Sequence, residues 1–158
     1  MSASPKLSRQ VGVVFEQLDR LLAVNSGLLE KCRTASPDTT EITAMSAVLH
    51  SFYTGIENLF KRLTVEMGGS MPRGEFWHAD LLESMCNPTA DRSAVIDDVL
   101  RAHLKNYLDF RHVFRHAYTF ELNWSRMAAL ALGMQETLRL LKEEVNAFLV
   151  SIGQEPIV

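Results

Sequence analysis

The chain has 158 residues, of which 47% are hydrophobic and 22% charged, a composition typical of one soluble globular domain. A formal net charge of −3 argues against attraction of the whole molecule to nucleic acid or anionic lipid. The two cysteines, Cys32 and Cys86, are too few for a secreted disulfide framework. We therefore expect one domain over residues 1–158, with both thiols reduced.

The N-terminal segment, residues 1–9, is polar and lacks the apolar core of a signal peptide. No apolar run approaches the ~18 residues that a membrane span requires. These two features predict a cytoplasmic protein that does not enter a membrane.

Apolar residues recur at steps of three and four in four long stretches, and none shows a sustained period of two. The first stretch covers residues 7–32, with a weak point at Asn25-Ser26-Gly27 that favours a bend. The second begins after Asp38, which with Glu41 forms a capping-box-like start, and ends at Gly68-Gly69.

A short amphipathic piece follows over residues 77–86. We expect the third long helix to start near Ser93 and to carry its apolar stripe as far as Tyr118, and the fourth to run from Met127 to Ile152. Four long helices joined by short or moderate loops predict an all-α antiparallel bundle, with the short helix across one end.

The segment between residues 101 and 126 reverses the charge balance of the chain. It also holds three of the five histidines, so it is where we look for chemistry. The cations are Arg101, Lys105, Arg111, Arg115 and Arg126, the acids are Asp109 and Glu121, and the histidines are His103, His112 and His116.

Arg111 interrupts the apolar stripe of the third long helix, between Tyr107 and Phe114. A guanidinium on a buried stripe is costly unless it is paired or faces a solvated cleft. Arg111 therefore either extends to solvent or meets one buried carboxylate, as in many structural sites, or it belongs to a functional site.

His116 lies five residues after Arg111, about 140° further round a continuous helix. The two side chains converge on one substrate only if the helix ends or kinks near His116, or if a second subunit supplies the missing partner. His112 and His116 have the i, i+4 spacing of a shared metal, but no third or fourth ligand accompanies them. We predict no metal site.

Glu57 and Lys61 are an i, i+4 pair beside the apolar stripe of the second helix. One interpretation is an exposed ion pair, which stabilises a helix by a few tenths of a kcal/mol. In the other, Glu57 lies at the edge of the core and neutralises and orients Arg111. The sequence favours neither.

Residues 111–118, Arg-His-Val-Phe-Arg-His-Ala-Tyr, match Arg-x4-His-x-Tyr, and this motif resembles that of the HEPN superfamily and of its HepT toxin branch. Segments 55–62 and 74–82 are similar to the corresponding HepT-like positions. The likeness extends from about Thr40 to the C-terminus. HepT-like members often have Asn after the arginine and a small residue before the histidine, where this chain has His112 and Arg115.

The resemblance implies a HEPN-like helical fold and a metal-independent endoribonuclease without a cofactor. It would be the toxin of a toxin–antitoxin pair, usually a homodimer, with an MNT-type nucleotidyltransferase as antitoxin. Arg111 and His116 would be catalytic, and Tyr118 would accept AMP from the partner, which silences the nuclease.

The residue types suit that chemistry. RNA cleavage without a metal can use the 2′-OH as nucleophile, a histidine as general acid or base, and a fixed cation at the phosphorane oxygens. One histidine cannot conveniently make both proton transfers, so a two-fold dimer would supply a second motif. Arg115 and His112 would then hold flanking phosphates.

Two further hypotheses remain open at this point. The chain could be a catalytically inactive helical binding subunit of a nucleotidyltransferase, which binds its partner and leaves RNA intact. It could also be a purely structural helical bundle, although that hypothesis does not explain why Arg111 lies on the apolar stripe.

Overall fold

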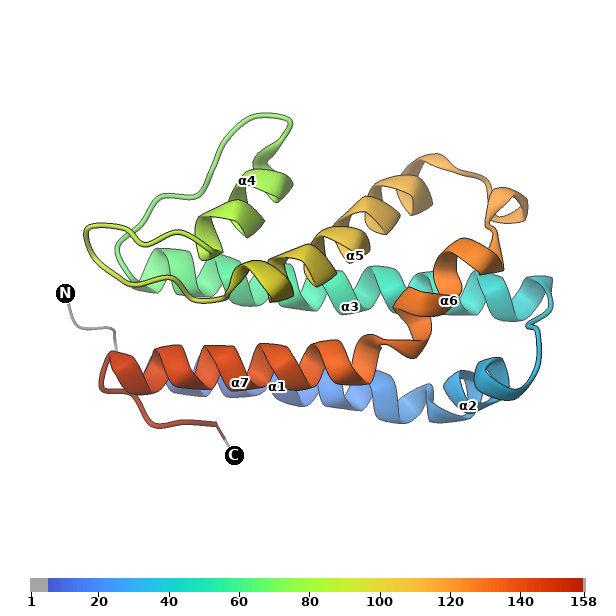
Figure 1. Ribbon diagram of the computed structural model, residues 1–158, viewed down its shortest axis with the longest axis horizontal. Helices are drawn as coiled ribbons and strands as arrows, with labels where there is room; N and C mark the ends of the chain where they lie inside the picture. The colour runs from blue at the N-terminus through green and yellow to red at the C-terminus, as the bar shows by residue number, and fades with distance from the viewer. Residues whose placement is uncertain (1–5, 158) are drawn as a thin grey trace.

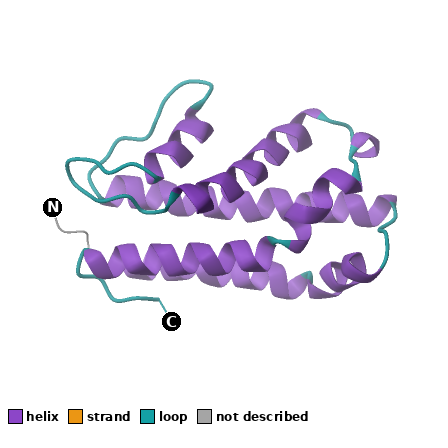
Figure 2. Cartoon of the chain, in the orientation of Figure 1, coloured by secondary structure: helices purple, strands orange, loops and turns teal. Residues whose placement is uncertain are grey.

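The computed structural model describes residues 6–157 and is all-helical, with no strand in that range (Figures 1 and 2). None of the described helices is both long and apolar enough to span a membrane. The elements are α1 (Lys6–Val24), α2 (Ser26–Thr34), α3 (Thr39–Glu66), α4 (Trp77–Met85), α5 (Asp98–His116), the 3₁₀ turn η1 (Thr119–Glu121), α6 (Trp124–Leu132) and α7 (Met134–Ser151).

The four long helices α1, α3, α5 and α7 alternate in direction along the chain (Figure 1). α3 is the central element, because it contacts α1, α4, α5 and α6, whereas α7 packs on α1 and α5. The largest fully buried side chains are Tyr53, Phe52 and Phe60, all from α3. The core therefore forms around one face of α3, and the flanks of that helix are where the other helices meet it.

The break between α1 and α2 and the start of α3 lie where the neighbouring residues predict them. α1 and α2 are separated at Asn25, whose side-chain amide donates to the Leu21 carbonyl at 2.8 Å, so the predicted weak point is confirmed. At α3 the backbone N–H of Glu41 donates to Asp38 at 2.8 Å, and the Glu41 carboxylate accepts from the Asp38 backbone at 2.9 Å. The predicted capping box is confirmed, and it satisfies two of the unpaired donors at the helix start.

The predicted start of the third long helix near Ser93 is wrong. α5 begins at Asp98, where Asp97 caps it by accepting a hydrogen bond from the Leu100 backbone N–H at 2.8 Å. The preceding residues Val95 and Ile96 are buried, and their backbone N–H groups donate to the Met85 carbonyl. These hydrogen bonds hold residues 95 and 96 in a non-helical conformation, and Asp is as good an N-cap as Ser.

The fourth predicted helix is divided into α6 and α7 at Gly133, so the predicted total of five helices is wrong: seven α-helices form within residues 6–157. At the division, the Tyr107 hydroxyl of α5 donates to the Leu130 carbonyl at 2.7 Å. A Cβ on Gly133 would lie 2.8 Å from the Ala129 carbonyl oxygen. A contact from a distant helix therefore accompanies this break.

We expect Asp97→Ala to lower the free energy of unfolding by about 1 kcal/mol, because the start of α5 loses its cap. Urea unfolding of the purified chain measures the change. Ser93→Ala is the matched control and should change stability by less than about 0.5 kcal/mol. Equal effects of the two substitutions would contradict the assigned start of α5.

Candidate active site around Arg111

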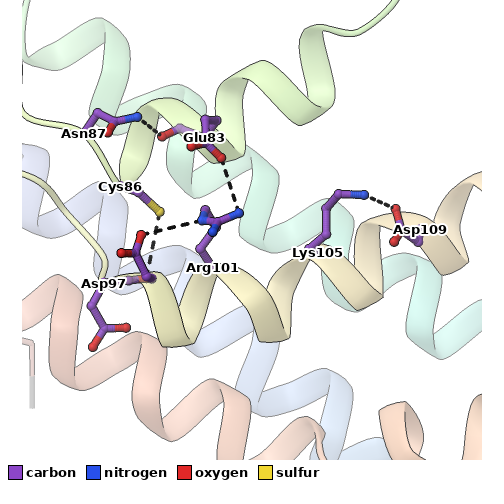
Figure 3. A network of polar contacts seen from close by, with 8 residues as sticks. Glu83, Cys86, Asn87, Asp97, Arg101, Lys105 and Asp109 are labelled. Atoms are coloured by element: carbon purple, nitrogen blue, oxygen red, sulfur yellow. Dashed lines mark hydrogen bonds and ion pairs between the residues drawn. The ribbon is translucent and has the colours of Figure 1, made fainter.

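The five cations of the basic segment fall into two groups. Arg101 lies 3.5 Å from the Glu83 carboxylate of α4, and Lys105 lies 2.5 Å from Asp109 on α5 (Figure 3). The nearby Cys86 thiol, whose pKa burial raises to about 11, contacts the Asp97 carbonyl. This end of α5 is neutralised and serves to attach α4.

Arg111, Arg115 and Arg126 are the second group, and within residues 6–157 none of them forms an ion pair or a side-chain hydrogen bond. Arg111 is partly buried between α5 and α3, and its Nε is fully buried with no partner. A buried donor without a partner costs about 1–3 kcal/mol, and more when it carries a charge. The prediction that Arg111 breaks the buried stripe is confirmed, and its guanidinium has no counter-ion.

His50 of α3 faces this guanidinium from across the helix pair. Its ring lies 5.2 Å from the ring of Phe114, one turn after Arg111. Burial lowers the pKa of His50, and the charges of Arg111 and Arg115 lower it further. No sequence signal marked His50, because it belongs to no motif and lies far from Arg111 in the sequence. Only the packing of α3 on α5 brings the two residues close together.

Glu57 is buried on α3, at 3% exposure. Its carboxylate accepts a hydrogen bond from Nδ1 of His78 on α4 at 2.6 Å. An exposed ion pair with Lys61 is therefore wrong, and so is direct neutralisation of Arg111, since no such contact forms within residues 6–157. The pair with His78 instead attaches α4 to α3.

Lys61 and Trp77 complete this attachment. The Lys61 ammonium lies 4.7 Å from the Trp77 ring centroid, and that ring stacks on His78 at 3.6 Å. A cation over an aromatic face is attracted by the ring quadrupole. Trp77 and His78 lie in the short helix predicted over residues 77–86 and in segment 74–82 of the resemblance, but their contacts were not predicted.

The histidines of the motif lie on another face of α5. α5 is uninterrupted from Arg111 to His116, which is its last residue, and the Ala117 N–H donates to the Val113 carbonyl at 3.0 Å. His112 and His116 are exposed, with ring centroids 4.6 Å apart. Arg111 and His116 therefore point to different sides of one chain. In the described part of the chain no three His, Cys, Asp or Glu side chains form a group that could hold a metal.

Tyr118 lies beyond the end of α5, so its predicted place on the helical stripe is wrong. Ala117 takes an extended conformation that ends the helix. The Tyr118 side chain is 72% exposed and stacks on Phe120, with ring centroids 5.4 Å apart. Its phenol is thus accessible from solvent beside the exposed motif histidines.

A family model described as HepT-like protein matches residues 44–152, more than half of the chain. The chain belongs to the HepT-like family. Comparisons with curated proteins and with solved structures find no match. The matched range of this HepT-like protein includes Glu57, Lys61 and the whole motif from Arg111 to Tyr118, and leaves out α1 and α2.

We expect Glu57→Gln to lower the free energy of unfolding by about 1–3 kcal/mol, because His78 loses its carboxylate and the buried amide pairs with it less well. Thermal or urea unfolding measures the loss. Glu75→Gln, at an exposed position just before α4, should leave stability within about 0.5 kcal/mol. If Glu57→Gln were as mild as this control, the attachment of α4 would not depend on the pair.

His50 should make stability depend on pH. Since its pKa is lower in the folded protein, the unfolded chain takes up the proton more readily, and the free energy of unfolding falls as the pH drops below about 6.5. Urea unfolding of the wild type and His50→Gln at pH about 7.5 and about 5.5 should show a smaller fall in the variant. His103→Gln, at an exposed position on α5, should retain the fall of the wild type.

Proposed function

We propose that this HepT-like protein is a metal-independent endoribonuclease and the toxin of a toxin–antitoxin pair. The observation that carries the proposal is Arg111, a partly buried guanidinium with a fully buried Nε and no counter-ion within residues 6–157. Such a group suits an anion supplied from outside, and a phosphodiester accepts its donors in bidentate fashion. The place of Arg111 in the Arg-x4-His-x-Tyr sequence supports RNA as the source.

The reaction would proceed by attack of the 2′-oxygen on the adjacent phosphorus. One His116 takes the proton of the 2′-OH, the new O–P bond forms, and the bond from phosphorus to the 5′-oxygen breaks. A protonated His116 gives its proton to that leaving oxygen, so the products are a 2′,3′-cyclic phosphate and a 5′-OH end. Arg111 stabilises the charge on the non-bridging oxygens during the transfer.

A homodimer would complete the site. Arg111 lies against α3 whereas His116 lies on an exposed face at the end of α5, so one chain does not present both to the same phosphate. A two-fold axis that brings two motifs together would place His116 of the partner subunit near Arg111 and would also supply the second proton-transfer group. The unpaired Arg115 and the exposed His112 would then hold flanking phosphates.

Glu57 and Lys61 would support this site from α3. Through His78 and Trp77 they hold α4 beside the same flank of α3 that Arg111 contacts. Their role is positional, because Glu57 is buried and already has a partner. This arrangement would keep the surroundings of Arg111 rigid when RNA binds.

Silencing would come from an MNT-type nucleotidyltransferase that transfers AMP to Tyr118. The phenol is accessible, and it follows the last residue of the motif helix by two positions. A bulky phosphodiester at this place would obstruct the exposed histidines and repel an incoming RNA phosphate.

The test is incubation of the purified protein with total RNA in EDTA. We expect cleavage to fragments that end in cyclic phosphate, a loss of about 10²–10⁴-fold in His116→Ala and of about 10²–10³-fold in Arg111→Ala. His103→Gln should cleave like the wild type. An equimolar mixture of the two inactive variants should recover part of the activity, because mixed dimers restore one Arg111 and one His116 to the shared site.

Intact RNA with wild-type protein would reject the nuclease. If the protein then still formed a stable complex with the nucleotidyltransferase, the catalytically inactive binding subunit would replace it. Cleavage that persists unchanged in both alanine variants would point to a contaminating nuclease and would equally contradict the assignment.

A further inference from the structure

A groove runs between α1 and α3. It consists of two adjoining pockets of about 300 Å³ and 480 Å³, and Gln17 of α1 and Asn58 of α3 line both. His50 lines one end of the groove, and Arg62 lines the other. Because His50 also lies close to Arg111, the groove begins beside the candidate active site.

Buried polar atoms without partners gather along this groove. The described residues contain five such atoms, and three of them are Gln10 Oε1, His50 Nδ1 and Thr54 Oγ1, from side chains that line the groove. A fourth is Nε of Arg111, which does not line the groove but whose charge acts on His50. Buried polar groups are nearly always paired in native proteins, so a concentration of unpaired ones indicates a surface that a ligand completes.

Positive charge lies at the ends of the groove, and its middle is uncharged. Uncharged polar side chains, Gln17, Ser51, Thr54 and Asn58, line the groove together with the apolar Val13, Val14, Leu18 and Leu21, and no acidic side chain lines either pocket. Arg62 lines one end of the groove, and His50 at the other end is close enough to Arg111 for that charge to lower its pKa. Neither arginine forms an ion pair within residues 6–157. The ends therefore suit phosphates, and the middle suits neutral groups that both donate and accept hydrogen bonds, such as ribose hydroxyls and base edges.

His50 lies between Arg111 and the uncharged part of the groove, and it is a neutral hydrogen-bond donor. Burial and the nearby cations lower its pKa, so the ring is uncharged near neutral pH. The buried Nδ1 has no partner within residues 6–157, and a neutral ring with its proton on Nε2 keeps one N–H donor. An uncharged Nε2–H beside Arg111 can donate to a phosphate or ribose oxygen without repelling the guanidinium.

We propose that the groove between α1 and α3 binds a single strand of RNA that leads from Arg111 to Arg62, with His50, Thr54 and Asn58 as contacts between them. The two pockets of about 300 Å³ and 480 Å³ are of the size that holds one nucleotide or two, which favours a single strand over a duplex. From His50 to Arg62 the groove spans about 18 Å along α3, enough for more than one nucleotide. The inference rests on the proposed function, because it names the path of that enzyme's substrate.

Fluorescence anisotropy with a labelled oligoadenylate, in EDTA and in a His116→Ala background that leaves the strand uncut, tests the groove. Arg62→Ala should weaken binding about 3–10-fold at low salt and reduce the slope of log K against log salt by about 0.7, as expected for one lost phosphate contact. Thr54→Val and Ser51→Leu should weaken binding about 3–10-fold at every salt concentration, since they remove a hydroxyl or fill the pocket.

Two matched substitutions serve as controls. Arg20→Ala on α1 and Thr40→Val on α3 change exposed side chains that line neither pocket, and each should change binding less than about 2-fold. Circular dichroism of every variant shows whether it is folded.

The outcomes separate the groove from the nuclease. If the wild type cleaves RNA but the groove variants bind the oligonucleotide as tightly as the controls, the groove proposal is wrong and the nuclease stands. If the wild type does not cleave RNA but the groove variants bind the oligonucleotide more weakly, RNA binding in the groove is supported and the nuclease proposal is wrong. If Ser51→Leu converts a dimer to a monomer in sedimentation, the groove is an interface between two copies and the proposed RNA path is wrong. The proposal is also wrong if every groove variant binds the oligonucleotide as tightly as the wild type does.

Discussion

An arginine without a counter-ion between two packed helices is the constraint around which this HepT-like protein is organised. Arg111 cannot withdraw to solvent completely, because Tyr107 and Phe114 on the same stripe hold α5 against α3. Its buried Nε has no partner within residues 6–157, which disfavours the isolated protein and favours any state in which an anion is bound. His50 does not repel this cation, because burial and the nearby arginines lower its pKa and favour the neutral ring.

The surrounding charges leave that cation available. Glu57, which the sequence offered as a partner for Arg111, pairs with His78 instead. Arg101 and Lys105 pair with Glu83 and Asp109. A chain with a net charge of −3 thus keeps a local excess of unpaired positive charge near the end of α5. Local pairing, and not the total charge, decides where an anion can bind.

Sequence patterns predicted the features that depend on neighbours along the chain. The division at Asn25, the capping box of Asp38 and the interruption of the stripe at Arg111 all follow from residues within a few turns. The start of α5 and the break at Gly133 did not, since burial of Val95 and Ile96 and the hydroxyl of Tyr107 involve distant elements. Tyr118 was misplaced because periodicity does not show where a helix ends.

The amino-acid sequence by itself determined an all-helical chain, the position of its unusual arginine and a resemblance to the HepT-like family, because periodicity, capping and spacing are local properties. Only the tertiary structure decided that Glu57 pairs with His78, that His50 packs on Phe114 within the field of Arg111, and that α1 and α3 enclose a groove with unpaired polar atoms. Each of these depends on helices far apart in the chain, and the burial that pairs or isolates a polar group exists only once those helices have packed.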